Sequence, residues 1–134
     1  MTFKLINPAS LGTPRGYSNG VLTPAGGRLL FVAGQVGWNE KQTIVSERFV
    51  DQFDRALANV IAVITEAGGR PDQIARLVLY VTDKKEYTER RNEVGKCYRA
   101  RMGKHFPAMM LVEVKSLLEA DAKVEIEAVA VLHP

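Results

Sequence analysis

The sequence predicts an α+β domain in which two helices cover one face of a β-sheet. Two segments carry apolar residues at every third or fourth position, which is the period of an amphipathic helix. Extended runs precede, separate and follow these segments, and the last run alternates apolar with acidic residues. The predicted order is β-β-β-α-β-α-β-β, which leaves one face of the sheet without helices.

The strands are expected at six places along the chain. In chain order they span residues 3–6, 17–22, 29–34, 76–82, 109–114 and 123–131. The first two have the weaker patterns, whereas the third is an apolar run bounded by glycines. In the last strand Val124 and Ile126 alternate with Glu125 and Glu127. This alternation predicts that both acids face away from the helices.

The two helices are expected over residues 47–67 and 84–102. Ser46 is the predicted N-cap of the first helix, because its hydroxyl can accept a hydrogen bond from the first turn. Asp83 fits the aspartate form of a capping box before the second helix. Cys97 lies in the apolar stripe of the second helix, so we expect it to act as a small buried hydrophobic residue.

The sheet face opposite the helices is predicted to be apolar and uncovered. Val129 and Val131 of the last strand are expected on this face, together with Met109 and Leu111 of the strand before it. An uncovered apolar face is typical of self-association. We therefore expect a homo-oligomer.

Length and composition favour a small intracellular domain. The chain has 134 residues, so a single domain over residues 1–134 is expected, and its single cysteine gives no intrachain disulfide. No apolar run approaches a membrane span and no signal-peptide pattern occurs, so the predicted location is the cytoplasm. The net charge of +3 comes from scattered side chains, which does not favour a nucleic-acid partner. No cofactor or metal is expected, because nucleotide-binding glycine motifs and metal-ligand spacings are lacking.

The first candidates for chemistry are polar groups within apolar strands. Glu125 and Glu127 either form salt bridges or lie at a solvated end of the sheet, or oligomerisation buries one of them. Burial would raise the pKa of a carboxyl group towards the range in which it exchanges protons with substrate or water. The loop RGYSNG at 15–20 offers the hydroxyl of Tyr17 between glycines, which let backbone donors approach a ligand, and Gly34 has a similar position.

Taken together, several short segments resemble the RidA/YjgF family, whose members are also named endoribonuclease L-PSP. They are GYSNG at 16–20, FVAGQ at 31–35, QF at 52–53, ALANV at 56–60, EAGG at 66–69, YVTD at 80–83, NEVG at 92–95, FPA at 106–108, VEV at 112–114 and VEIEAVAV at 124–131. The resemblance covers nearly the whole chain in order. It implies a chorismate-mutase-like fold with a mixed sheet, a homotrimer with three intersubunit clefts, and cofactor-independent hydrolysis of reactive imines and enamines.

The resemblance also assigns roles to individual positions. Tyr17 is similar to the family's cleft tyrosine, and Glu125 to the carboxylate that orients the attacking water. Gly34 and Asn92 fall at positions that are near the cleft in the family. These four residues form the predicted site together with Met109, Leu111 and Arg15.

The chain departs from the family pattern at two positions. The arginine that grips the substrate carboxylate is replaced by Met109, and the usual cysteine two residues later by Leu111. Truncating one partner of such an ion pair costs about 2–5 kcal/mol. We therefore expect Met109 and Leu111 to form an apolar cleft wall, with Met110 in the core. The substrate is expected to lack the standard anchor or to be held elsewhere, for example by Arg15.

Three functions are compatible with this reading. The first is a deaminase-type hydrolase acting on an imine, an enamine or a related small metabolite. The second is a non-catalytic trimer that binds a small metabolite or a protein. The third is an endoribonuclease, which rests on the older family name alone, since the sequence shows neither a histidine pair nor a dense basic stripe.

Overall fold

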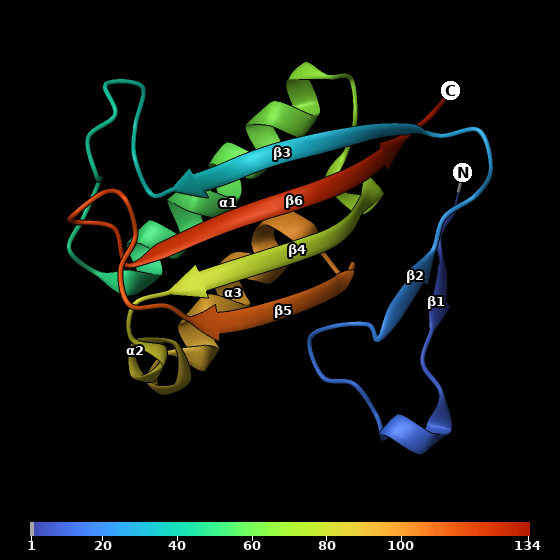
Figure 1. Ribbon diagram of the computed structural model, residues 1–134, viewed down its shortest axis with the longest axis horizontal. Coiled ribbons are helices and arrows are strands. Elements are labelled where there is room, and N and C mark those ends of the chain that lie inside the picture. Colours follow the sequence, from blue (N-terminus) through green and yellow to red (C-terminus); the bar gives the residue numbers. More distant parts are fainter. Residues whose placement is uncertain (1) are drawn as a thin grey trace.

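A four-stranded mixed sheet forms the centre of the computed structural model, which describes residues 2–134. The strand order is β3-β6-β4-β5, with β4 and β5 parallel and the other neighbours antiparallel (Figure 1). The bounds are Arg28–Val36 for β3, Ile74–Val81 for β4, Ala108–Glu113 for β5 and Val124–Leu132 for β6. The α+β class and the mixed sheet are therefore confirmed.

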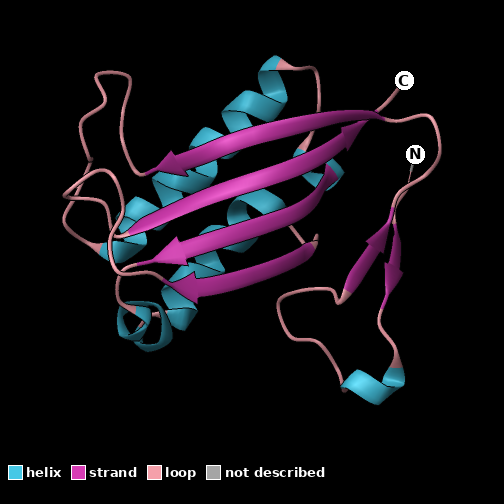
Figure 2. Ribbon diagram, viewed as in Figure 1, coloured by secondary structure: helices cyan, strands magenta, loops and turns pink. Residues whose placement is uncertain are grey.

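The helices all lie against the same face of this sheet (Figure 2). They are α1 at Phe49–Glu66, α2 at Lys84–Glu89 and α3 at Arg91–Met102. The single helix expected over 84–102 is thus two helices, because Arg90 leaves the helical conformation with φ −116° and ψ 22°. Asp83 caps α2 by accepting a hydrogen bond from the backbone N–H of Lys85 at 2.9 Å.

The start of α1 differs from the predicted one. The helix begins at Phe49, and Ser46 lies two residues before the N-cap position. Its hydroxyl accepts a hydrogen bond from the backbone N–H of Arg48 at 3.0 Å and donates to Asp51 at 2.8 Å. Ser46 therefore fixes the turn that leads into α1 rather than capping the helix itself.

The hydrophobic core lies between the helices and the sheet. Phe53, Leu57 and Val60 of α1 are buried against Val124 and Ile126 of β6, and each of the five is at most 2% exposed. Burying each side chain of this size contributes roughly 1.5–3 kcal/mol. The spacing that predicted α1 is therefore the spacing that fills the core.

Strand β6 confirms the predicted alternation, whereas β5 corrects it. Val124 and Ile126 face the core, so Glu125 and Glu127 lie on the open face. In β5, Met109 and Leu111 pack against the core on the helix side, and Met110, 47% exposed, lies on the open face.

The reversal in β5 follows from strand pairing. Met109 pairs with Leu77 of β4, and Leu77 is buried under the helices. Directly opposed residues of neighbouring strands point to the same face of a sheet. The predicted positions of Met109 and Leu111 on the open face, and of Met110 in the core, are therefore wrong.

The apolar character of the open face also comes from residues other than those predicted. Leu29 and Phe31 of β3 are 62% and 72% exposed, whereas Val131 is 4% exposed. Val131 is thus covered within the chain itself. The outer edge of β3 has no strand partner among the described residues.

The N-terminal segment forms a separate two-stranded ribbon. Strands β1 (Lys4–Ile6) and β2 (Gly20–Leu22) pair with each other and stand away from the main sheet, with a short 3₁₀ turn at Ala9–Leu11 between them (Figure 1). Ser18 attaches this segment to the beginning of β5. Its backbone N–H donates to the carbonyl of Pro107 at 3.0 Å and its hydroxyl to that of Phe106 at 2.6 Å.

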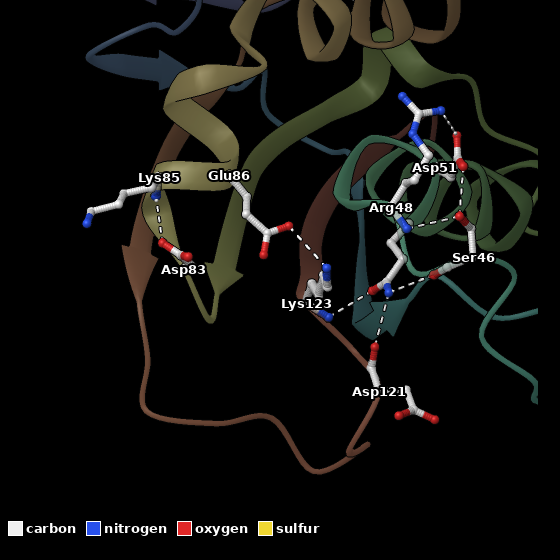
Figure 3. A network of polar contacts seen from close by, with 9 residues as sticks. Ser46, Arg48, Asp51, Asp83, Lys85, Glu86, Asp121 and Lys123 are labelled. Carbon is white, nitrogen blue, oxygen red and sulfur yellow. Dashed lines mark hydrogen bonds and ion pairs between the residues drawn. The ribbon is translucent and has the colours of Figure 1, made fainter.

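A buried amide holds the beginning of β6 in place. Gln52 of α1 is completely buried, and its amide group donates to the backbone carbonyls of Ser46 at 2.9 Å and Asp121 at 3.0 Å. Its side-chain oxygen accepts from the backbone N–H of Lys123 at 2.8 Å, within the polar network of Figure 3. Two segments distant in sequence, residues 46–52 and 121–123, are therefore joined two residues before Glu125.

Within residues 2–134, no helix combines the length and the apolar character that crossing a membrane requires.

Candidate functional site

Glu125 and Gly34, two residues of the predicted site, lie together on the open face. A methyl carbon placed on Gly34 would lie 2.8 Å from Cδ of Glu125 and 3.0 Å from its Cγ. The register of β3 shifts between Val32 and Gln35, which places the intervening glycine beneath the carboxylate. The Glu125 side chain thus occupies space that is free because residue 34 has no side chain.

The neighbouring acid, Glu127, has a different environment. The hydroxyl of Tyr80 donates to its Oε1 at 2.6 Å, and this hydrogen bond is the main cause that raises the pKa of Tyr80. Neither Glu127 nor Glu125 forms an ion pair within residues 2–134. Glu127 is therefore held by a tyrosine, whereas Glu125 is placed by the glycine below it.

Tyr17 lies near the end of the sheet opposite to Glu125. It is 38% exposed and lines a hollow of about 200 Å³ together with Arg76, Met109 and Met110. The adjacent Ser18 is bonded to the chain at the beginning of β5, which fixes the position of this loop.

Within a single chain, Tyr17 and Glu125 are too far apart to contact the same small ligand. Ser18 bridges to Ala108, which pairs with Arg76 of β4, whereas Glu125 pairs with Tyr80 four residues further along the same strand. At ~3.3 Å per residue, the two ends are about 13 Å apart. A site that uses both residues needs a second copy of the chain.

The remaining predicted residues fall in different places. Met109 lines a cavity of about 140 Å³ between the sheet and α3, whereas Leu111 packs into the adjoining core. Asn92 is exposed at the beginning of α3 and does not line this cavity. Arg15 is exposed next to Gly16, which does line it.

Helix α3 contributes residues to this cavity that were not predicted from the sequence. Arg91, Gly95 and Arg99 line it from the helix side. Their spacing of four residues, which puts them in one row on a helix, is the signal that could have identified them.

The thiol of Cys97 and the potential metal ligands are not arranged for catalysis. Burial raises the pKa of the Cys97 thiol, which lowers the fraction of reactive thiolate at neutral pH. Across residues 2–134, no three His, Cys, Asp or Glu side chains lie close enough to hold a metal ion.

Comparison with known proteins identifies the family. A family model described as Endoribonuclease L-PSP matches residues 8–132. The chain belongs to the RidA/YjgF family. Among its relatives, a RutC family protein of Aquifex aeolicus is 37% identical over 102 residues, 76% of this chain and 79% of that protein. A 2-iminobutanoate/2-iminopropanoate deaminase of Escherichia coli K12 is 32% identical over 127 residues, 92% of this chain and 91% of the relative.

Solved structures of RidA/YjgF proteins share this fold. YyfB, a conserved Rid family protein from Yersinia pestis, superposes with a TM-score of 0.86 at 29% identity, covering 98% of this chain and all of that one. The YjgF gene product of E. coli gives a TM-score of 0.66 at 31% identity, covering 93% and 92% of the two chains. Family membership supports imine-deaminase or L-PSP-type endoribonuclease activity in general terms.

Proposed function

We propose that this RidA/YjgF protein is a cofactor-independent hydrolase that converts small imines or enamines to carbonyl compounds and ammonia. The observation that carries the proposal is the Glu125 carboxylate, held over Gly34 on the open face of the sheet. A fixed carboxylate without a competing ion pair can take a proton from a water molecule and aim that water at an electrophilic carbon.

The proposed reaction needs one proton carrier. Water adds to the carbon of the protonated C=N bond, its oxygen forms the new C–O bond, and one of its two protons passes to Glu125, which leaves a neutral carbinolamine. Glu125 returns that proton to the nitrogen. The C–N bond then breaks as the hydroxyl group forms the C=O bond and gives its remaining proton to Glu125, so ammonia and a carbonyl compound leave, and Glu125 releases this proton to the solvent. An enamine first accepts a proton on carbon to become the imine.

The proposed site forms between subunits of a homotrimer located in the cytoplasm. Two observations support assembly through the open face. Leu29 and Phe31 are largely exposed there, and Tyr17 and Glu125 of one chain lie near opposite ends of the sheet. In an assembly, Tyr17 of one subunit would orient a substrate near Glu125 of another. Native mass spectrometry tests this: a mass three times that of the chain is expected, and a monomer at micromolar concentration would contradict it.

The activity test compares two acids of the same strand. The assay uses the imine that the wild type hydrolyses fastest among a panel derived from different amino acids, and formation of its 2-oxo acid above the spontaneous rate is measured. Glu125→Gln is expected to lower the rate by about 100-fold or more, the contribution typical of a general acid–base group. The matched control is Glu127→Gln, which alters an acid on the same face that is hydrogen-bonded to Tyr80. Equal rates for wild type and Glu125→Gln would remove Glu125 from the mechanism.

The substrate of this chain is proposed to differ from that of its deaminase relatives, because Met109 offers no donor to a carboxylate. Assaying a panel of imines derived from different amino acids tests this. Ligands that raise the melting temperature without being turned over would instead favour a metabolite-binding trimer. Cleavage of added RNA by the purified protein, lost in a Glu125 variant, would favour an endoribonuclease.

A further inference from the structure

The cavity beside Met109 is apolar inside and basic at its mouth. It measures about 140 Å³ and is lined by residues of α1, α3, β4 and β5. Phe53, Leu57 and Leu77 form its interior and are at most 2% exposed. Its exposed lining residues include Arg91 and Arg99, both from α3. A ligand that fits both parts has an apolar body and a negative charge.

The two arginines are available to bind an anion. Other arginines of the same region are engaged, for example Arg101, whose Nε lies 2.7 Å from Asp54. Within residues 2–134, neither Arg91 nor Arg99 forms an ion pair. The guanidinium carbon of Arg91 instead lies 6.0 Å from the ring centre of Tyr87, which also lines the cavity.

Gly95 leaves the space between the two arginines open. The three residues follow one another at intervals of four, so they form one row that spans ~12 Å along the helix. A methyl carbon placed on Gly95 would lie 3.0 Å from Nη1 of Arg99 and 3.6 Å from its Cζ. The Arg99 guanidinium therefore folds back over the glycine, towards Arg91 and the mouth of the cavity.

We propose that Arg91 and Arg99 bind the carboxylate of a small acid whose apolar body enters this cavity. They would supply the charge that the family resemblance places at position 109, where this chain has Met109. An Arg guanidinium presents paired N–H donors that match a carboxylate. This inference rests on the proposed function in one respect: the bound acid is taken to be the imine substrate. Because Glu125 of the same chain lies on the opposite, open face of the sheet, the carboxylate that acts on a substrate held here would be Glu125 of a neighbouring subunit.

The size of the cavity narrows the class of substrate. Apolar cavities of about 150 Å³ hold a guest the size of benzene. A volume of about 140 Å³ thus suits the side chain of a 2-imino acid derived from phenylalanine or leucine. The smaller 2-iminopropanoate would leave most of this apolar space unfilled, so it is expected to be a poorer substrate.

The binding test uses stable probes and does not depend on turnover. Phenylacetate and its neutral analogue phenylacetamide are titrated into the assembled protein and followed by amide chemical shifts and calorimetry. Phenylacetate is expected to bind, to weaken as salt is added, and to bind about tenfold or more tightly than phenylacetamide. Arg99→Ala and Arg91→Ala should each weaken phenylacetate binding by about 10- to 100-fold and leave phenylacetamide binding unchanged.

Two further variants separate the site from general charge effects. Arg90→Ala removes a guanidinium from the residue preceding α3 that does not line the cavity, and it should leave phenylacetate binding unchanged. Gly95→Leu should block the mouth and abolish binding of both probes. All variants change exposed or half-exposed positions, and circular dichroism verifies that they remain folded. Equal loss in Arg90→Ala and Arg99→Ala would overturn the proposal.

Failure of this inference can be told from failure of the proposed function. If imines are hydrolysed but Arg91→Ala and Arg99→Ala leave KM for the phenylalanine-derived 2-imino acid unchanged, the arginine site is wrong and the hydrolase stands. If phenylacetate binds through the arginines while no imine is hydrolysed, the site stands and the hydrolase is wrong.

Discussion

Replacing Gly34 by alanine tests whether the position of the Glu125 carboxylate matters. The new methyl carbon would lie 2.8 Å from Cδ of Glu125, whereas carbon atoms in contact are normally about 3.5–4.0 Å apart. The carboxylate must therefore move by about 1 Å. A misplacement of that size at a reacting centre can lower the rate by about 100-fold.

Folding should hardly be affected by this change. Gly34 is exposed, its φ is not positive, and the atoms that obstruct the methyl group belong to the end of a flexible side chain. Gly→Ala at a compatible position stabilises by about 0.4–1 kcal/mol through the unfolded state. We therefore expect the free energy of unfolding to change by no more than about 1 kcal/mol.

The assay is imine hydrolysis by Gly34→Ala, with urea unfolding measured on the same sample. Glu127→Gln is the control, because it alters another acid of the open face and leaves the space beneath Glu125 unchanged. We expect a loss of about 100-fold in kcat/KM for Gly34→Ala and full activity for Glu127→Gln. Full activity in Gly34→Ala, when Glu125→Gln is inactive, would refute the argument that the glycine positions the carboxylate.

Three further predictions concern stability and reactivity. Gln52→Ala removes three buried hydrogen bonds and should lower the free energy of unfolding by about 3 kcal/mol, measured in urea; a loss below about 1 kcal/mol would contradict the importance of this amide. Burial raises the pKa of Tyr98 above its usual 10.0, so its stabilising contribution is complete below pH 10 and decreases as the pH rises above that value. Wild type should therefore lose stability above pH 10 more steeply than Tyr98→Phe, and parallel curves would disprove this. The Cys97 thiol, whose pKa burial raises, should react with a disulfide reagent more slowly in the native protein than in urea; equal rates would show that it is freely accessible.

The sequence is sufficient to orient β6 but not β5. In β6, acids alternate with apolar residues, so one of the two possible faces is clearly apolar. In β5, residues 109–112 are all apolar, and both choices of face are equivalent in pattern. Pairing of Met109 with Leu77 decides between them, and this long-range contact leaves no trace in the local sequence.

Individual residues of the candidate site could be predicted from the sequence, but their arrangement in space could not. Glu125 and Gly34 were predicted as site residues on different strands, whereas their contact depends on the register shift in β3. The separation of Tyr17 from Glu125 depends on strand order, since the loop of Tyr17 attaches to β5 rather than to β3. The break at Arg90 is similar, because the apolar spacing continues across it and predicts one helix.

The exposed edge of β3 has a consequence for how the protein is made. A newly folded chain presents the outer edge of β3, a strand of nine residues that pairs with β6 on its other side, and Leu29 and Phe31 are exposed along it. Such an edge recruits any extended segment that it meets, including those of unfolded neighbours. Productive assembly and aggregation therefore compete for the same surface. We expect the yield of soluble protein to fall when synthesis outpaces folding, and to recover when a lysine replaces Phe31 at the cost of the oligomer.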